Sequence, residues 1–479
     1  MATQKIESPL QKAWKRLKTN YPAMFSIVII VVAILLAIAA SMIAPDKTPN
    51  ANDQILEIAN ESPGFKIDIL KVRRNRPVRK ANFLVKTFTG RDNPYEMVPI
   101  NGFTFDSIYV VADVYRGSMY ASEMDTFHIL DVLYPFDGQE QKVSFDGESV
   151  TYTLPNGTKE STNILNLQKQ VEMEAAFTKV YRLGTDKFGR DILSRLLFGL
   201  RVSLSVGLVA VMISLTIGIA IGATAGYYRN DKIKISNASK LAVIITLVTL
   251  FLLLVFGVNL SFTNHAVLSF LIALALFVGA IALLRFVFKL IGPPFSTKGF
   301  LNYDDMATWL INVVWSIPTI LLAMALSFAL GKWIKSFWVI YIAVGLSMWV
   351  EVARIVRGQV MVVREMEFVQ AARGLGYNNF RIIVLHILPN IIGPLMVIMA
   401  ANFAAAILIE AGLSFIGIGV QPPKPSLGNM LSEYRNYLYI PGKAFLALAP
   451  GFCIMVLVLA FNLIGNGLRD AFDVKGKLK

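Results

Sequence analysis

The sequence predicts an all-α membrane protein of about eight spans into which one β-rich extracytoplasmic domain is inserted. Three observations lead to this prediction. First, the 479-residue chain is 55% hydrophobic and 16% charged, with a mean hydropathy of +0.56, whereas about a quarter of the residues in a soluble domain are charged. Second, its apolar residues form runs long enough to cross a hydrocarbon core of about 30 Å. Third, the segment 45–182 contains short alternating runs instead.

The first apolar run covers residues 25–44 and follows a stretch rich in Lys and Arg. Its length favours an uncleaved transmembrane helix, although the small residues at 39–41 leave a cleaved secretory signal peptide as an alternative. Seven further apolar runs complete the predicted set of spans: 203–227, 241–258, 266–291, 307–330, 337–352, 391–413 and 444–464.

Basic residues set the predicted orientation of these spans. The formal net charge is +14. Lys and Arg gather in the amino-terminal tail, in 229–240, in 354–381 and after 469, which an eight-span topology places on one side. By the positive-inside rule, both termini are cytoplasmic and 45–182 lies outside. This distribution accounts for the positive charge without nucleic-acid binding.

The outer segment 45–182 has the pattern of a small β-rich domain. Its alternating or β-branched runs lie at 65–72, 107–114, 142–145 and 149–154, and a helix is expected at 164–177. Turn-forming pairs separate several of these runs, as in β-hairpins. The pairs are Asp137-Gly138, Asp146-Gly147 and Asn156-Gly157.

Enzymatic and metal-binding functions find little support in the residues. Cys453 is the single cysteine and the three histidines are far apart, so neither an internal disulfide nor a structural zinc site is expected. Asp186, Arg190 and Asp191 precede the second span without a nucleophile or metal cluster, which favours ion pairing or helix capping over catalysis. The chain has no phosphate-binding GxxxxGK[ST] loop.

The first half of the cytoplasmic loop 364–390 carries the most specific pattern. It reads Glu-Phe-Val-Gln-Ala-Ala-Arg-Gly-Leu-Gly from Glu367 to Gly376. The central Gln and Ala residues favour a short helix. Gly376 can then supply the left-handed cap that ends it.

The second half of the loop predicts another helix followed by a stop. Phe380, Ile383 and Val384 form an apolar stripe at helical spacing, and Pro389 interrupts the pattern before the next span. A helix of this kind can lie along the membrane surface and fit a groove of a partner protein.

This loop resembles the EAA loop of permease subunits in bacterial ABC importers. The family pattern is Glu-Ala-Ala, three residues, Gly, nine residues and Ile-x-Leu-Pro. The chain matches it in register and departs at Gln370 and His386. The resemblance implies that the loop couples the chain to an ATPase, although Arg373 is equally compatible with lipid headgroups. The implied coupling residues are Glu367, Gln370, Ala371, Ala372, Arg373, Gly374, Gly376, Leu388 and Pro389.

Two more stretches, 183–195 and 410–423, resemble the second permease of dipeptide and oligopeptide importers. With 460–471 they extend the resemblance over 183–228 and 303–474, plus the first helix. The long outer domain and the extra hairpin 241–291 depart from the usual six-span subunit. The expected organisation is an amphipathic cytoplasmic N-terminus (1–24), the first helix (25–44), the outer domain (45–182), the start of the transmembrane domain (183–240), the inserted hairpin (241–291) and the transmembrane core (292–479).

The resemblance implies a multi-pass subunit of the bacterial inner membrane with a type I ABC importer fold. The implied partners are a homologous second permease, two ATP-binding-cassette subunits that hold ATP and Mg, an extracytoplasmic substrate-binding protein and membrane lipid. Neither a cofactor bound by this chain nor a nucleic-acid partner is expected. The outer domain is either a solvated spacer or a docking surface for the binding protein. Peptide is the implied cargo, and nickel, glutathione or a peptide antibiotic are alternatives.

Glu410 and Asn402, on the seventh predicted span, are candidates for a pore or gate. Ionisable residues at membrane depth have functional roles by default. The alternative for Glu410 is an interfacial position where it caps the turn before Gly412. A secondary transporter driven by an ion gradient is the more remote alternative function, and it predicts buried carboxylate pairs and broken helices.

Overall fold

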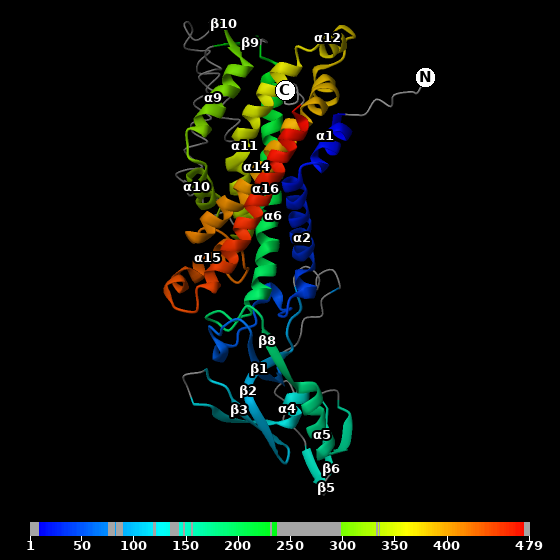
Figure 1. Ribbon diagram of the computed structural model, residues 1–479, viewed down its shortest axis with the longest axis vertical. Helices are drawn as coiled ribbons and strands as arrows, with labels where there is room; N and C mark the ends of the chain where they lie inside the picture. Colours follow the sequence, from blue (N-terminus) through cyan, green and yellow to red (C-terminus); the bar gives the residue numbers. More distant parts are fainter. Residues whose placement is uncertain are drawn as a thin grey trace, which may run out of the picture. The chain divides into compact units, whose positions relative to one another are not determined.

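The computed structural model in Figure 1 describes residues 9–74, 82, 90–117, 121–134, 143–146, 149–154, 157–229, 232–236, 298–331, 334 and 336–473. Five helices in this part of the chain are long and apolar enough to span a membrane. They are α2 (Tyr21–Ile43), α6 (Ile192–Tyr227), α11 (Ser336–Val363), α14 (Ile392–Phe415) and α16 (Phe445–Phe472). The predicted spans 241–258 and 266–291 lie outside the described residues, so the count of about eight spans stays a prediction.

The predicted span 307–330 is two helices and not one. α9 (Tyr303–Trp315) and α10 (Thr319–Gly331) meet at 90° across a short break. Pro318 lies in this break, where its ring removes a backbone donor and disfavours a helical conformation at Ile317. The sequence did not predict this bend, and the described residues hold six spans if the bent pair counts as one.

The chain divides into two compact units. The first consists of Met1–Val31, Ser203–Gln421 and Ile454–Lys479, and the second of Val32–Val202 and Pro422–Cys453. Each unit has its own buried apolar clusters.

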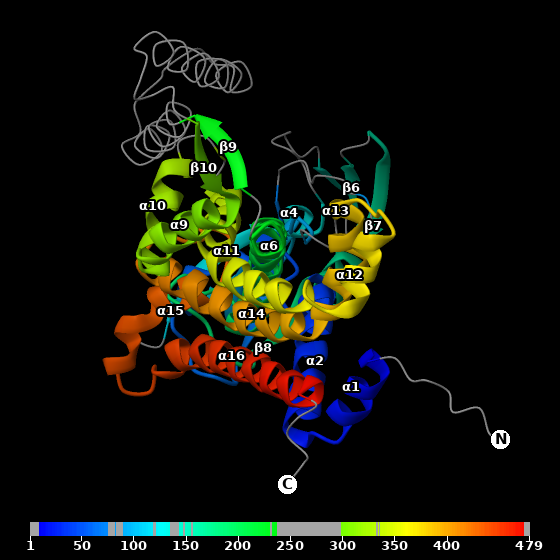
Figure 2. The ribbon, with the colours of Figure 1, turned by 90° about the horizontal axis from the view of Figure 1, so that it is seen from above.

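In the first unit, α6 and α11 touch through their backbones. Gly218, Gly222 and Gly226 lie four residues apart near the end of α6, and a Cβ at Gly222 would lie 2.4 Å from the carbonyl oxygen of Ala353. A Cβ at Gly226 would lie 2.7 Å from the carbonyl oxygen of Arg357. Small residues at this spacing allow membrane helices to approach closely. Figure 2 shows α6, α11 and α14 side by side, and their apolar residues share one buried cluster.

The amino-terminal helix α1 (Pro9–Lys18) belongs to the same unit. Its Ala13 and Leu17 are buried and share an apolar cluster with Leu468 and Ala471 of α16. Apolar residues four apart lie on one face of a helix. This face of α1 therefore packs on the carboxyl end of α16.

The second unit contains two antiparallel sheets. One has five strands in the order β4-β3-β2-β1-β8, and the other three strands in the order β5-β6-β7. The strands are β1 (Phe65–Arg73), β2 (Tyr95–Asp106), β3 (Tyr109–Val114), β4 (Glu123–His128), β5 (Val143–Asp146), β6 (Ser149–Thr153), β7 (Lys159–Asn163) and β8 (Ala176–Tyr181). Leu70, Ile100 and Val150 lie in one buried cluster with residues of the short helices α4 (Ile129–Leu133) and α5 (Ile164–Gln170). Phe65 of β1 and Tyr181 of β8 are register partners.

The helix expected at 164–177 is shorter than predicted. α5 is followed by one π-helical turn, Val171–Ala175, and the chain then enters β8. Pairing with β1 over Phe65–Leu70 draws this segment into the sheet, because tertiary pairing overrides local helix preference. The turn pair Asp137-Gly138 lies outside the described residues.

Two short strands lie at the base of the predicted hairpin 241–291. β9 (Lys232–Ser236) and β10 (Lys298–Asn302) pair antiparallel, with Ser236 opposite Lys298. They bring the two ends of the insertion together. These two strands were not predicted from the sequence.

Candidate functional site

The loop between α11 and α14 begins with the short helix α12 (Glu367–Gly374). Gly376 has a φ of +77°, in the left-handed region that favours glycine. The backbone amide of Tyr377 donates to the carbonyl of Ala372 at 3.2 Å, which satisfies a carbonyl at the end of the helix. The predicted left-handed cap is therefore confirmed.

The second half of the loop winds more widely than an α-helix. The Asn378 side chain caps α13 (Asn379–Arg381), and a π-helical turn, Ile382–Ile387, follows. A π turn has i→i+5 hydrogen bonds and more residues per turn than an α-helix, so residues five apart lie nearly on one side. Ile382 and Ile387 accordingly both face the core and are completely buried.

The predicted apolar stripe was consequently only partly right. Ile383 is buried, but Val384 is 37% exposed and Phe380 is 75% exposed. Because of the wider turn, Ile382 and Ile387 are buried, although the α-helical spacing did not predict this.

Tyr227, the last residue of α6, holds this loop in place. Its hydroxyl donates to Oδ1 of Asn379 at 2.9 Å and accepts a hydrogen bond from Nε of Arg373 at 3.3 Å. The Arg373 guanidinium also lies 4.7 Å from the centre of the Tyr227 ring. Arg364 donates to the backbone carbonyl of Tyr227 at 2.5 Å. One buried tyrosine thus connects α6 to both halves of the loop. Sequence reasoning missed Tyr227, because no local pattern marks it.

Replacing Tyr227 with Phe is expected to loosen the loop without unfolding the protein. The substitution removes the hydroxyl that contacts Arg373 and Asn379, and a typical hydrogen bond contributes about 1 kcal/mol. Backbone amides of 367–391 should then exchange roughly five-fold faster, as measured by hydrogen exchange with mass spectrometry. Tyr228→Phe is the matched control, because the Tyr228 hydroxyl makes no hydrogen bond with the described residues. Equal exchange in the two variants would contradict the assigned role.

The residues predicted to couple to an ATPase separate into an outer and an inner set. Ala372 is 4% exposed and packs in the same cluster as Val369, and Leu388 is half-buried. The outer, solvent-exposed set consists of Glu367, Gln370, Ala371, Arg373, Gly374, Gly376 and Pro389.

The same loop also exposes large apolar side chains. Leu375 is 73% exposed, Phe380 is 75% exposed and Leu385 is 58% exposed. Met366 and Phe368 are also exposed. Arg373 and Arg381 lie among them, and Arg381 stacks over the Tyr377 ring. An exposed apolar patch bordered by cations is typical of a protein interaction site. We call the exposed residues of 366–389 the coupling surface.

Glu410 and Asn402 are both buried in α14. Glu410 accepts hydrogen bonds from Ser203 of α6 at 3.0 Å and from Ser414 at 2.8 Å, and it is completely buried. Burial inside the protein does not give the depth of Glu410 in the membrane, so both its pore role and its interfacial alternative stay predictions. Asn402 is 1% exposed, and its side-chain nitrogen has no hydrogen-bond partner among the described residues. The structure does not test a pore or gate role for either residue.

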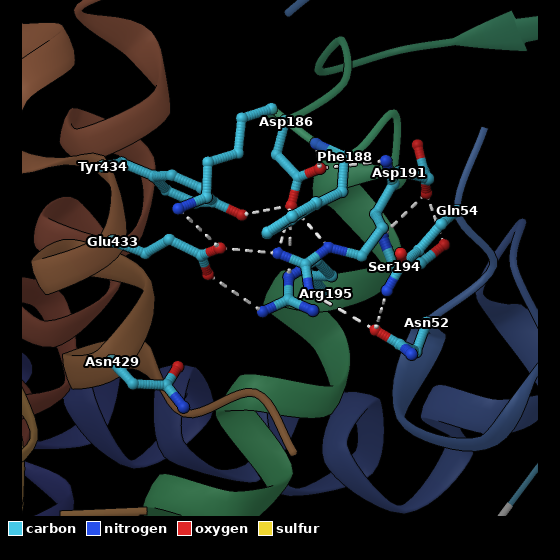
Figure 3. Close-up of polar contacts among 12 residues, drawn as sticks. Asn52, Gln54, Asp186, Phe188, Asp191, Ser194, Arg195, Asn429, Glu433 and Tyr434 are labelled. Atoms are coloured by element: carbon cyan, nitrogen blue, oxygen red, sulfur yellow. Dashed lines mark hydrogen bonds and ion pairs between the residues drawn. The ribbon is translucent and has the colours of Figure 1, made fainter. Parts of the chain in front are cut away.

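A second buried polar cluster lies in the other unit (Figure 3). Asp186 accepts from the Arg190 guanidinium at 2.7 Å and from the Tyr434 hydroxyl at 2.9 Å. Arg190 also contacts Glu433 of α15 (Leu427–Tyr434) at 2.8 Å, and Arg195 contacts the same carboxylate at 3.4 Å. We call these five residues the ionic cluster. The predicted pairing of Arg190 with a carboxylate is confirmed.

The charges in the ionic cluster are balanced by their neighbours. Burial alone would lower the pKa of Arg190, but the charges of Asp186 and Glu433 and the hydrogen bond to Asp186 raise it on balance. Burial raises the pKa of Tyr434, so its hydroxyl stays a donor. Arg190 does not cap the start of α6, which was the other predicted role. Asp191 does so by accepting from the backbone amide of Ser194 at 2.8 Å.

Among the described residues, no group of three or more His, Cys, Asp or Glu side chains is placed to hold a metal ion. The residues of the coupling surface and of the ionic cluster are arranged for binding and for holding segments of the chain together. They do not bring a nucleophile and a general base together.

Comparison with known proteins places the chain among transport proteins. Residues 300–475 match the family described as the binding-protein-dependent transport system inner membrane component, and residues 8–63 match the N-terminal TM domain of oligopeptide transport permease C. The dipeptide transport system permease protein DppC of Alkalihalophilus pseudofirmus is 33% identical over 61% of this chain and 72% of its own length. The di/tripeptide transport system permease protein DppC of Pseudomonas aeruginosa is 31% identical over 62% and 73%.

Two further matches are more distant. The glutathione transport system permease protein GsiD of Pectobacterium atrosepticum is 29% identical over 62% of this chain and 73% of its own length. A chain of the MetNI methionine ABC transporter in an inward-facing conformation aligns with a TM-score of 0.37 and 15% identity, covering 59% of this chain and 96% of that chain.

Proposed function

Because this chain belongs to the family of binding-protein-dependent ABC importer permeases, we propose that it forms part of the translocation pathway of a peptide importer and that ATPase subunits drive it through the loop 364–390. The observation that carries this proposal is the coupling surface. It exposes Leu375 and Phe380 to solvent while Tyr227 fixes the loop behind it to α6.

The proposed mechanism transmits motion through two rigid connections. α12 and the following turn sit in a groove of an ATPase subunit, which moves when nucleotide closes the ATPase pair. Tyr227 passes this motion to α6, and the buried Ile391 passes it to α14. The permease then alternates between outward-facing and inward-facing forms. ATP and Mg are held by the partners, because this chain has no phosphate-binding GxxxxGK[ST] loop.

We propose the following assembly. The chain pairs with a homologous second permease, binds two ATP-binding-cassette subunits and receives cargo from an extracytoplasmic substrate-binding protein. It resides in the bacterial inner membrane with both termini cytoplasmic, as the distribution of Lys and Arg indicates. Glu410 and Asn402 contribute to the pore or gate, since polar groups buried at membrane depth are often functional.

Short peptides are the proposed cargo. The relatives are named for dipeptides, for di- and tripeptides and for glutathione, and a peptide backbone is common to all three. ATP-dependent uptake of a labelled dipeptide into proteoliposomes that hold the assembled complex tests this. Unlabelled peptides should reduce the uptake of the labelled dipeptide. If nickel reduces this uptake and peptides do not, the cargo is the metal and not a peptide. Uptake without ATP would favour a secondary transporter.

The sheet domain, residues 65–181 with strands β1 to β8, is the proposed dock for the binding protein, and its deletion tests this role. Phe65 and Tyr181 are register partners on neighbouring strands, so a short Gly-Ser linker can join them and remove 66–180. The hydrogen bond from the Ile55 amide to the Phe188 carbonyl remains intact. We expect binding-protein-dependent uptake to fall at least roughly ten-fold, with unchanged membrane levels and basal ATP hydrolysis. Unchanged uptake would make the domain a solvated spacer.

A further inference from the structure

Helix α1 (Pro9–Lys18) presents two different faces. Ala13 and Leu17 are buried on one face, against residues of α16. The remaining described side chains of the helix, residues 11, 12, 14, 15, 16 and 18, are exposed. They include the cations Lys12, Lys15, Arg16 and Lys18, and the helix contains no acidic residue. The packing of the first face thus leaves the cationic face exposed to solvent, and Arg16 also donates to the Asp473 carbonyl at 3.3 Å.

Three exposed aromatic residues lie on α1 and at the start of α2. Trp14 is 48% exposed, with the Lys18 ammonium 5.5 Å from the centre of its ring. At the start of α2, Tyr21 is 83% exposed and Phe25 is 68% exposed. Trp and Tyr prefer the interface between a bilayer and water. These aromatics therefore mark the level of the lipid headgroups along the chain.

The connection between α1 and α2 is short and ordered. The amide of Thr19 donates to the carbonyl of Arg16, and the Asn20 side chain accepts from the amide of Ala23. Only residues 19 and 20 separate the two helices. Since α2 is long and apolar enough to cross a membrane, the carboxyl end of α1 at Lys18 is held within a few residues of the membrane surface.

Stabilisation of the helix end explains only part of this charge pattern. Lys and Arg in the last turn favour the negative end of the helix dipole, which accounts for Lys15, Arg16 and Lys18. Lys12 lies outside the last turn, and the dipole does not explain an exposed Trp14 on the same helix. Both features fit an anionic, hydrated interface with apolar material beneath it.

We propose that α1 is a surface-lying anchor whose exposed face binds the headgroups of anionic phospholipids in the adjoining leaflet. Lys12 and Lys18 contact the phosphates, and Trp14 inserts its ring at the level of the acyl-chain boundary. The buried Ala13 and Leu17 transmit this attachment to the carboxyl end of α16. Basic segments next to a membrane span have this affinity for anionic lipid. This inference depends on the chain's being a membrane protein and is independent of the proposed cargo.

The test is a lipid titration of the detergent-purified complex, followed by native mass spectrometry. The probes are phosphatidylglycerol and phosphatidylcholine, and the variant is Lys12→Gln/Lys18→Gln. Its phosphatidylglycerol affinity should fall by roughly five- to thirty-fold, given the contribution of each basic residue near an anionic surface. Phosphatidylcholine binding should not change, and salt should weaken the wild-type binding to phosphatidylglycerol.

The matched control is Lys66→Gln/Lys169→Gln, which removes two exposed lysines from the sheet domain. It should bind phosphatidylglycerol as the wild type does. Equal phosphatidylglycerol affinity of the α1 variant and the wild type would overturn the proposal. So would loss of co-purified ATPase subunits from the α1 variant at unchanged phosphatidylglycerol affinity, because the face would then dock a protein. If the double variant fails to fold, the single variants Lys12→Gln and Lys18→Gln are measured in its place.

Discussion

Replacing Ala371 with Arg should abolish ATP-driven uptake while leaving the protein folded and in the membrane. Ala371 is exposed on the outer face of α12, so the new side chain extends into solvent in the isolated chain. In the assembled importer it would bring an unpaired cation into the ATPase groove. Burial of an unpaired charge costs several kcal/mol, which corresponds to a loss of roughly two orders of magnitude in affinity or more.

The measurement pairs peptide uptake in proteoliposomes with the amount of ATPase retained on the purified chain. Ala121→Arg is the matched control, because Ala121 is an exposed alanine of the sheet domain. Ala372→Arg provides the opposite comparison, since Ala372 is 4% exposed and a large cation there should disrupt folding. Normal uptake by Ala371→Arg would contradict the role of the coupling surface.

Gly376→Asp is a milder version of the same experiment. No atom lies within 4 Å of a Cβ at Gly376, so the cost in the free chain comes from the left-handed backbone alone and amounts to about 1 kcal/mol. The added carboxylate should therefore reduce coupling more than it reduces folding stability.

Removing Arg190 should cause the largest loss of stability in the second unit. Its side chain is 4% exposed and contacts Asp186, which is completely buried, and Glu433. Without the guanidinium, both carboxylates lose their main partner. Breaking a buried ion pair by removal of one member costs about 3–5 kcal/mol. We expect Arg190→Ala to lower the unfolding temperature and the membrane level of the protein.

Arg116→Ala is the control for this prediction. Arg116 pairs with Glu57, Glu123 and Asp125, but its side chain is 36% exposed. Ion pairs at the surface contribute about 0–1 kcal/mol, so this variant should differ little from the wild type. Thermal unfolding in mild detergent compares the two. An equal loss of stability in both variants would show that burial does not strengthen the ionic cluster.

The sequence was sufficient to identify features that depend on neighbouring residues. Apolar runs located α2, α6, α11, α14 and α16. The cap at Gly376 followed from residue type alone, because few other residues accept its backbone conformation. Pro318 is a residue type that can bend a helix, and it could have indicated the break. The bend was not predicted, because the apolar residues continue on both sides of Pro318.

Features that depend on distant residues could not be found in this way. Tyr434 donates to Asp186 and Glu433 pairs with Arg190, each across more than two hundred residues of chain, and no spacing rule relates these residues. Tyr227 reaches Asn379 across 152 residues of chain. The π turn at Ile382–Ile387 changed the buried face of the loop by altering the helical period, which an α-helical pattern cannot represent.

Affinity purification of the tagged chain in mild detergent, followed by mass spectrometry, tests the central claim most directly. The account predicts that the wild-type chain retains ATP-binding-cassette subunits and a homologous permease, and that Ala371→Arg loses the ATPase subunits but keeps the permease. The contradicting result is recovery of the wild-type chain alone, folded and able to transport peptide into liposomes without ATP.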